Sequence, residues 1–139
     1  MKVKDVMHTG ATCVEPTTPV REIAKRMRES DVGALPVMAN GHVVGIVTDR
    51  DLACRAIADS GDVGKMTARD VMTRDVVCCS PDDDIDVAIE VMEAKQIRRL
   101  PVTDSHKAMI GMLSLGDISH KLSKEKSGEV LRAVSGHHI

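Results

Sequence analysis

The chain has no aromatic side chains: its 139 residues include no Phe, Tyr or Trp. The hydrophobic core must therefore be built from Val, Ile, Leu, Ala and the nine Met residues. Aromatic stacking is unavailable, so any ring-shaped ligand must be held by aliphatic side chains and backbone groups. The same absence argues against a platform for single-stranded nucleic acid, which depends on stacking bases against aromatic rings.

The chain also lacks a large net charge, since its 19 basic and 21 acidic residues leave a net charge of −2. This balance argues against nucleic acid and anionic membranes as partners. No apolar run approaches the roughly 20 residues of a membrane helix. The charged N-terminus, residues 1–5, lacks the apolar stretch of a signal peptide. We expect a cytoplasmic protein that binds neither nucleic acid nor membrane.

Cysteines are few, and the spacing of the four fits neither a zinc site nor a small disulfide scaffold. In a cytoplasmic protein they are expected to be free thiols that mostly pack as small apolar groups. Adjacent residues on a strand point to opposite faces, so Cys78 and Cys79 make a poor disulfide. A redox role stays open for this pair, because one of the two thiols could lie near a ligand.

The six histidines show no paired metal-ligand spacing and are expected at the surface, so no metal site is predicted. They are His8, His42, His106, His120, His137 and His138.

An internal repeat organises the chain, as a self-comparison shifted by 65 residues shows. The matches keep one order along most of each copy, and after one inserted residue the shift becomes 66. We assign residues 1–58 to repeat 1, 59–68 to a linker, 69–122 to repeat 2 and 123–139 to a polar tail with one further short helix. The matching strings are Asp5-Val6-Met7 with Asp70-Val71-Met72, Leu35-Pro36-Val37 with Leu100-Pro101-Val102, Gly45-Ile46-Val47-Thr48 with Gly111-Met112-Leu113-Ser114, and Asp51 with Asp117.

Each copy has the order β-α-β-β-α. An extended segment ends at Pro16 or Pro81, and a helix with an apolar stripe follows, with Thr18 as N-cap and Pro19 at the first helical position of copy 1. Strands are predicted over 34–38 and 43–47, and over 100–103 and 109–113. Helices over 49–58 and 115–122 then begin after Thr48 and Ser114.

This order predicts an α+β (α/β) fold. Three short strands cannot easily bury one sheet, so we expect the two repeats to pack sheet to sheet about a pseudo-two-fold axis.

Two strings carry the candidate chemistry: Gly45-Ile46-Val47-Thr48-Asp49-Arg50-Asp51 and Gly111-Met112-Leu113-Ser114-Leu115-Gly116-Asp117. Each places a hydroxyl at a strand-to-helix junction and an Asp one turn later on the same side. A carboxylate there can accept two hydrogen bonds from a ribose diol, and a helix start favours phosphate. The structural alternative is a capping box that only satisfies helix-start amides. Two matched copies favour a ligand, and Asp51 is expected to be an exposed cleft carboxylate.

These strings resemble the cystathionine-beta-synthase (CBS) domain, which occurs in pairs called Bateman modules. The resemblance covers about residues 4–122 and rests on the repeated Asp-Val-Met, Leu-Pro-Val and Gly-Ile-Val-Thr-Asp-Arg-Asp strings. It implies two clefts that bind adenosine-containing ligands: AMP, ADP, ATP, S-adenosylmethionine or an NAD-type dinucleotide. It also implies that Thr48 and Asp51, and Ser114 and Asp117, contact ribose and phosphate.

The family often places basic residues just before the Leu-Pro-Val string, where they reach phosphates bound by the opposite repeat. Copy 2 has Arg98 and Arg99 there, whereas copy 1 has Gly33 and Ala34. The resemblance therefore implies unequal sites, with two guanidinium groups available to the Thr48/Asp51 cleft. The alternative for Arg98 and Arg99 is a solvated charge pair at a strand start.

The resemblance also implies that the base packs on the segment before each first proline. It assigns this role to Thr12, Cys13, Val14, Val77, Cys78 and Cys79.

Two functions remain open. One is a sensor that binds an adenine nucleotide as ligand, requires no cofactor and signals to an unknown effector protein. The other is a ligand-free dimerisation scaffold. Either way we expect a homodimer, with apolar contacts from the helices over 20–27 and 85–92, and no enzymatic activity, because no motif places a base beside Thr48.

Overall fold

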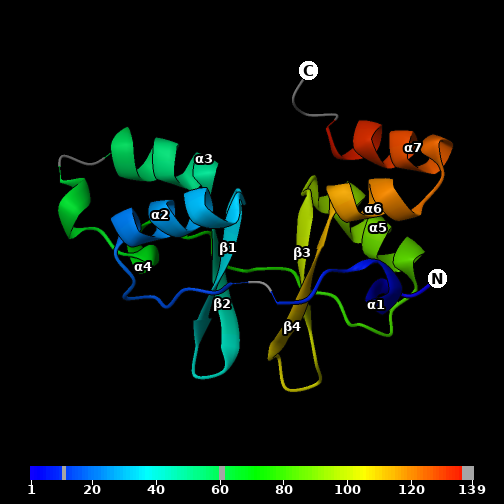
Figure 1. Cartoon of the computed structure of the whole chain (residues 1–139), viewed down its shortest axis with the longest axis horizontal. Coiled ribbons are helices and arrows are strands. Elements are labelled where there is room, and N and C mark those ends of the chain that lie inside the picture. Colours follow the sequence, from blue (N-terminus) through cyan, green and yellow to red (C-terminus); the bar gives the residue numbers. More distant parts are fainter. Residues whose placement is uncertain (11, 60–61, 136–139) are drawn as a thin grey trace. The chain divides into compact units, whose positions relative to one another are not determined.

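The structure is a computed structural model that describes residues 1–10, 12–59 and 62–135. Two compact units are present (Figure 1): unit 1 comprises Met1–Ala11 with Val77–Ile139, and unit 2 comprises Thr12–Val76. Each unit holds helices and a small sheet, so the α+β class is confirmed. Among the described residues, no helix is long and apolar enough to cross a membrane.

Unit 2 is built around one hairpin and the helix before it. Helix α2 (Val20–Ser30) buries Val20, Ile23 and Met27, which recur at helical spacing. Strands β1 (Ala34–Ala39) and β2 (His42–Thr48) pair antiparallel. A turn joins them with φ of 52° at Asn40 and 79° at Gly41, the left-handed conformations that this dipeptide tolerates.

The rest of unit 2 consists of short helical pieces. Helix α3 (Asp49–Asp51) continues directly into the π-helix η1 (Leu52–Ile57), and a 3₁₀ turn η2 (Val63–Lys65) precedes helix α4 (Ala68–Val71). The helix predicted over 49–58 is therefore present in extent but changes type after one turn.

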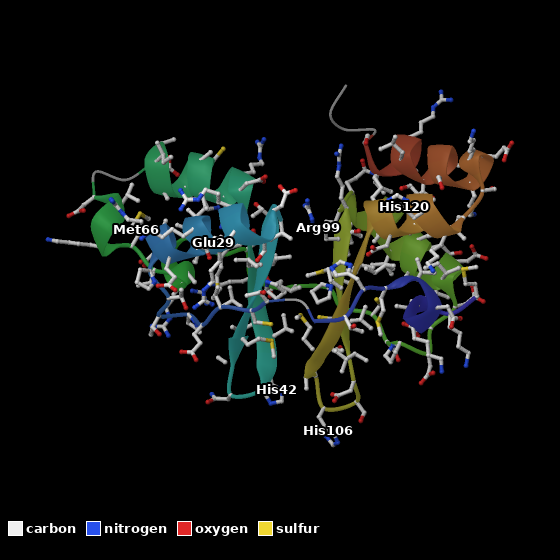
Figure 2. The ribbon with its side chains drawn as sticks, viewed as in Figure 1. Glu29, His42, Met66, Arg99, His106 and His120 are labelled. Carbon is white, nitrogen blue, oxygen red and sulfur yellow. The ribbon has the colours of Figure 1, made fainter. Side chains whose placement is uncertain are left out.

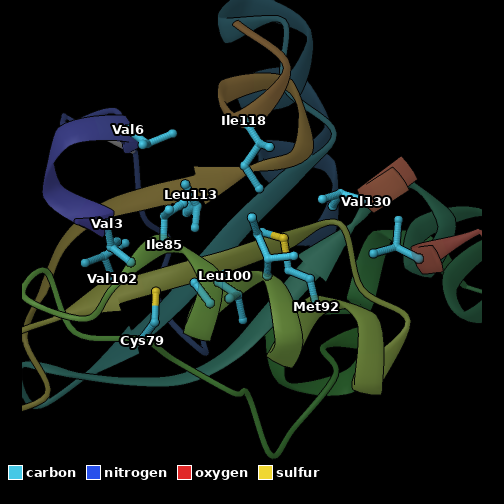
Figure 3. Packing of buried hydrophobic residues seen from close by; sticks show 13 residues of the cluster. Val3, Val6, Cys79, Ile85, Met92, Leu100, Val102, Leu113, Ile118 and Val130 are labelled. Carbon is cyan, nitrogen blue, oxygen red and sulfur yellow. The ribbon is translucent and has the colours of Figure 1, made fainter. Parts of the chain in front are cut away.

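Unit 1 repeats the plan and adds a helix. It contains α1 (Val3–Val6), α5 (Ile85–Lys95), β3 (Arg99–Thr103), β4 (Met109–Ser114), α6 (Leu115–Lys121) and α7 (Lys124–Val134). Strands β3 and β4 form an antiparallel pair. The core of this unit gathers aliphatic side chains from its helices and both strands (Figure 3), and Leu100, Leu113 and Ile118 are fully buried.

The extended segment predicted before each proline is reduced to a single bridge. Val14 pairs in parallel with Val37, and Cys79 pairs in parallel with Val102. The Val14 amide donates to Pro36 O at 2.9 Å and its carbonyl accepts from the Met38 amide at 2.8 Å, so this edge of the hairpin is closed.

The opposite edge of each hairpin is closed by the other sequence copy. Thr73, which follows Asp-Val-Met in copy 2, forms an antiparallel bridge with Ile46 of β2. His8, at the matching place in copy 1, forms the same bridge with Met112 of β4. The two copies therefore exchange their first segments, and the compact units cut across the sequence repeats.

The predicted start of α2 was wrong. Pro19 is the N-cap of α2 rather than its first helical residue, because the Thr18 hydroxyl accepts the Glu15 amide at 2.9 Å instead of capping the helix. The further helix predicted in the polar tail is present as α7, which is 11 residues long and has Val130 and Val134 fully buried in the unit 1 core. The end of the tail, including His137 and His138, lies outside the described residues.

Candidate functional site

The hydroxyl–aspartate pair of copy 1 lies where β2 runs into α3. The Thr48 Oγ1 accepts the Asp51 amide at 3.1 Å, and the Thr48 amide donates to Asp51 Oδ2 at 3.0 Å, which completes a capping box. The Thr73 hydroxyl lies 3.4 Å from both oxygens of Asp51, and Arg55 Nε lies 3.7 Å from Oδ1.

Asp51 is only 8% exposed, so the expectation of an exposed cleft carboxylate was wrong. The reason is the exchanged segment, which brings the Thr73 side chain onto this carboxylate from across the hairpin edge. The buried carboxylate still has hydrogen-bonding capacity, because its two oxygens offer about four acceptor sites. The group can cap the helix and still accept a further hydrogen bond.

The pair of copy 2 has the same geometry in unit 1. Ser114 Oγ accepts the Asp117 amide at 3.1 Å, and the Ser114 amide donates to Asp117 Oδ2 at 2.9 Å. The His8 Nδ1 lies 2.8 Å from Asp117 Oδ2; since a carboxylate only accepts, the ring N–H donates. His8 therefore stands in for Thr73, and Asp117 keeps more exposure, at 21% of its side chain.

Sequence reasoning missed Thr73 and His8 as neighbours of the two aspartates. A signal was available, because both residues directly follow the Asp-Val-Met string and match under the 65-residue shift. Their approach to Asp51 and Asp117 depends on the segment exchange, which the repeat pattern does not reveal.

The residues before each Leu-Pro-Val string lie beside the hydroxyl residue of their own unit. Ala34 pairs with Thr48 across the hairpin, and Arg99 pairs with Ser114. The Gly33 carbonyl accepts the Asp49 amide at 2.9 Å, and the Arg98 carbonyl accepts the Leu115 amide at 2.9 Å, so these positions also hold the helix starts.

Arg98 and Arg99 are both exposed. Arg99 is the first residue of β3 (Figure 2), and Arg98 directly precedes it. The Arg98 guanidinium donates to Ser135 Oγ at 3.1 Å, at the end of α7. Both arginines belong to unit 1 and the Thr48/Asp51 pair belongs to unit 2, so their action on one phosphate stays a prediction.

The two segments expected to hold the base differ in exposure. Val14 and Cys79 are buried in the cores of their units, while Cys13, Val77 and Cys78 are half-buried. The remaining member, Thr12, is exposed. Cys13 and Val14 also line a pocket of about 570 Å³ in unit 2, whereas Thr48 and Asp51 do not.

Three of the four thiols are held in their neutral form. Burial raises the pKa of Cys79 to about 12, with the charge of Asp83 and the neighbouring Cys78 adding to the effect. Burial also raises the pKa of Cys13 and that of Cys78, the latter against an opposing effect of Lys107. Since the thiolate is the reactive form, burial makes these three cysteines weaker nucleophiles. Within residues 1–10, 12–59 and 62–135, no cluster of metal-binding side chains is present.

Comparison with known proteins identifies the family. The CBS domain family matches residues 3–56 and 68–124, so the chain belongs to the CBS domain proteins and carries the domain twice. The CBS domain-containing protein YhcV of Bacillus subtilis is 36% identical over 138 residues, which cover 99% of this chain and 97% of YhcV.

Solved structures share the fold. The hypoxic response protein I structure, solved with two coordinated zinc ions, has a TM-score of 0.80 and 31% identity over 88% of this chain and all of its own. CBSX2 in complex with AMP has a TM-score of 0.76 and 25% identity, covering 86% of this chain and 94% of that one. A CBS domain pair in complex with 5′-methylthioadenosine and S-adenosyl-L-methionine has a TM-score of 0.78 and 26% identity, covering 86% and 98%.

Enzymes also match, but over a minor part of their length. Inosine-5′-monophosphate dehydrogenase of Methanocaldococcus jannaschii is 33% identical over 140 aligned residues, which cover 96% of this chain and 27% of the enzyme. The catalytic activity of that protein is therefore not carried over to this chain.

Proposed function

We propose that this chain is a regulatory module that binds an adenosine-containing ligand and passes the signal to a partner protein. The observation that carries the proposal is the matched hydroxyl–aspartate junction in both units, where each carboxylate is also contacted by a side chain from the other copy. Ligand binding at such a junction would act on both copies at once. The complexes of related CBS pairs with AMP, 5′-methylthioadenosine and S-adenosylmethionine support the ligand class.

The proposed contacts follow from the chemistry of each group. Asp51 and Asp117 accept hydrogen bonds from the ribose hydroxyls, and Thr48 and Ser114 lie at helix starts suited to phosphate. Arg98 and Arg99 supply charge-assisted hydrogen bonds to the phosphate of the Thr48/Asp51 site. The half-buried Cys13, Val77 and Cys78 flank the base together with neighbouring backbone groups.

Isothermal calorimetry tests the proposal with AMP, ADP, ATP, adenosine, NADH and S-adenosylmethionine. We expect at least one of these ligands to bind, and AMP to bind more tightly than adenosine. The absence of heat with every ligand at millimolar concentration would refute the sensor function.

The role of the two arginines has its own test. Arg98→Ala with Arg99→Ala is expected to remove most of the preference for AMP over adenosine and to reduce the salt dependence of AMP binding. Lys95→Ala with Lys121→Ala, which removes two exposed charges from the same unit, provides the control. Unchanged AMP affinity in the arginine variant would refute the proposal that the two sites are unequal, but it would not affect the assignment of the fold.

A ligand-free assembly scaffold is the second candidate function. It is favoured by the completeness of both capping boxes, since a cap alone explains why a hydroxyl and an aspartate stand at these positions. For either function we propose a homodimer. The larger apolar residues of α2 are buried inside unit 2, whereas its Ala24 is exposed. Val87 of α5 and Leu131 of α7 are 49% and 48% exposed and also remain available.

Light scattering at tens of micromolar protein tests the dimer. We expect a mass of twice the 15.0 kDa chain, and a mass of one chain would contradict the proposal.

A further inference from the structure

Unit 2 contains a pocket of about 570 Å³ beside the β1–β2 turn. This volume lies within the roughly 300–1,000 Å³ of small-molecule sites. The pocket shares Cys13 and Val14 with the proposed adenosyl contacts, but its other lining residues, including both of its charged side chains, are not among those contacts. It is formed by Cys13, Val14, Glu15, Pro16, Thr17, Met38, Ala39, Asn40, Gly41 and Arg69.

Two opposite charges line this pocket without neutralising each other. Glu15 and Arg69 are both exposed, and neither side chain makes an ion pair or hydrogen bond in the part of the chain that the structure describes. Their main chains are fixed, however: the Glu15 amide donates to Thr18 Oγ1 at 2.9 Å, and the Arg69 amide donates to Pro16 O at 3.0 Å.

The matching positions of the other copy show how such charges can be neutralised internally. Lys4 corresponds to Arg69 under the 65-residue shift, and its amide donates to Pro81 O at 3.0 Å, just as the Arg69 amide does to Pro16 O. The Lys4 ammonium, however, forms an ion pair of 3.2 Å with Asp82, where copy 1 has Thr17. Copy 2 also has Ser80 in place of Glu15. The unpaired couple is therefore particular to copy 1.

The remaining wall is uncharged. Pro16, Met38 and Ala39 are half-buried and supply apolar surface, while Thr17 and Asn40 supply a hydroxyl and an amide. Burial raises the pKa of the Cys13 thiol, which therefore stays neutral at pH 7. The charges of Glu15 and Arg69 are thus the only formal charges among the residues that line the pocket.

We propose that this pocket binds a small zwitterion: a molecule with one carboxylate, one ammonium group and a short apolar body, such as an aliphatic amino acid. The guanidinium of Arg69 can hold the carboxylate through two parallel hydrogen bonds. The Glu15 carboxylate faces the ammonium group, and the apolar body rests on the half-buried Pro16 and Met38. A simple anion would be repelled by Glu15 and a simple cation by Arg69, so only a ligand with both charges satisfies both groups.

Three probes of one shape test the proposal: leucine, 4-methylpentanoate, which lacks the ammonium group, and 3-methylbutylamine, which lacks the carboxylate. Each is titrated into the ¹⁵N-labelled full-length chain, and amide shifts are followed by NMR. Leucine is expected to shift the amides of residues 13–15, 17 and 38–41, since Pro16 has no amide proton. The other two probes are expected to bind about ten-fold more weakly, the loss corresponding to one charge-assisted hydrogen bond.

Two variants assign the charges. Arg69→Gln is expected to weaken leucine about ten-fold and to abolish its advantage over 3-methylbutylamine, and Glu15→Gln to abolish its advantage over 4-methylpentanoate. Lys4→Gln, the matched change in copy 2, is expected to leave leucine binding unchanged. AMP binding is expected to be the same in Arg69→Gln as in the parent chain. The proposal for the pocket and the proposal for the adenosyl site are therefore tested separately.

The proposal would be overturned if leucine gave no shifts at these amides at tens of millimolar. It would equally be overturned if 4-methylpentanoate bound as tightly as leucine, which would define a plain anion site, or if both variants bound leucine like the parent chain.

Discussion

The aspartates that follow Thr48 and Ser114 serve the fold before any ligand arrives. Asp51 caps a helix through the Thr48 amide and also meets Thr73 and Arg55, although it is almost fully buried. Such a group is costly to truncate, because its hydrogen-bond partners are left unsatisfied. Binding experiments on variants of Asp51 must therefore be read together with their stability.

Asp51→Ala is expected to lower the free energy of unfolding by about 1–3 kcal/mol, the range for a lost cap and hydrogen bonds to a charged group. Urea unfolding followed by circular dichroism measures the change. Asp49→Ala, at an exposed neighbour on the same turn, is the control and should cost less than about 1 kcal/mol. If the two variants were equally stable, Asp51 would have no structural role.

The buried thiol of Cys79 is expected to make the stability of the protein depend on pH, because its pKa is raised from an ordinary value of 9.0 to about 12. Because the folded pKa is raised, the unfolded chain loses this proton first as pH rises. The stabilisation is complete below pH 9 and declines towards pH 12, by about 1.4 kcal/mol per pH unit. Urea unfolding of the parent chain and of Cys79→Ala between pH 8 and pH 11 measures this decline. The difference between their free energies of unfolding should become smaller as pH rises. A constant gap would contradict the raised pKa.

At the scale of elements, α7 shows how a polar-looking tail joins a core. Only Val130 and Val134 of this helix are buried, and both pack in the unit 1 cluster with Met92 of α5 and Ile118 of α6. The Gln96 side-chain Nε2 donates to Ala133 O at 2.6 Å and connects α7 to the end of α5. The Lys126 ammonium of α7 also lies 3.8 Å from Asp86 of α5, so the helix is held by one narrow apolar side and by polar contacts near both of its ends.

Val130→Ala is expected to destabilise the protein by about 1.5–3 kcal/mol, from two lost methyl groups and the resulting cavity. Leu131→Ala removes a larger side chain next to it, but this residue is 48% exposed and the change should cost under about 0.5 kcal/mol. Thermal unfolding of both variants measures the difference. A larger loss for Leu131→Ala would mean that α7 is turned or docked differently.

For the whole molecule, the exchange of first segments ties the two copies together. Val3 and Val6 of copy 1 belong to the core of unit 1, while Ala68, Val71 and Met72 of copy 2 belong to the core of unit 2. Neither sequence repeat alone holds a complete core. The two sequence repeats are therefore interdependent, because each compact unit needs a segment from both of them.

Dividing the chain tests this interdependence. The fragment 1–65 lacks α4 and the buried residues beside it, each of which contributes about 1.5–3 kcal/mol if large and apolar. It should be largely unfolded by circular dichroism, and mixing with the fragment 66–139 should restore structure. The fragment 12–76, which matches unit 2, is the control and should melt cooperatively. If 1–65 melted like 12–76, the first segment of copy 2 would be dispensable.

The sequence by itself determined where helices and turns form and which of them carry the hydroxyl and aspartate residues of the candidate site. Apolar spacing placed α2 and α5, Asn40-Gly41 placed the β1–β2 turn, and the repeated Gly-to-Asp strings placed both hydroxyl–aspartate junctions. These features are local, because they depend on residues within about one or two turns of each other. The family could be named from the same strings, and the comparisons confirm it.

Only the tertiary structure decided which copy completes which sheet edge. A lone antiparallel bridge has no sequence signature, since its partners are set by the path of the chain rather than by side-chain periodicity. That path brings Thr73 to Asp51 and His8 to Asp117, buries the first carboxylate more than the second, and leaves Arg69 beside a pocket while Lys4 is paired. The inequality of the two copies is thus a property of contacts between residues distant in sequence, which no local pattern encodes.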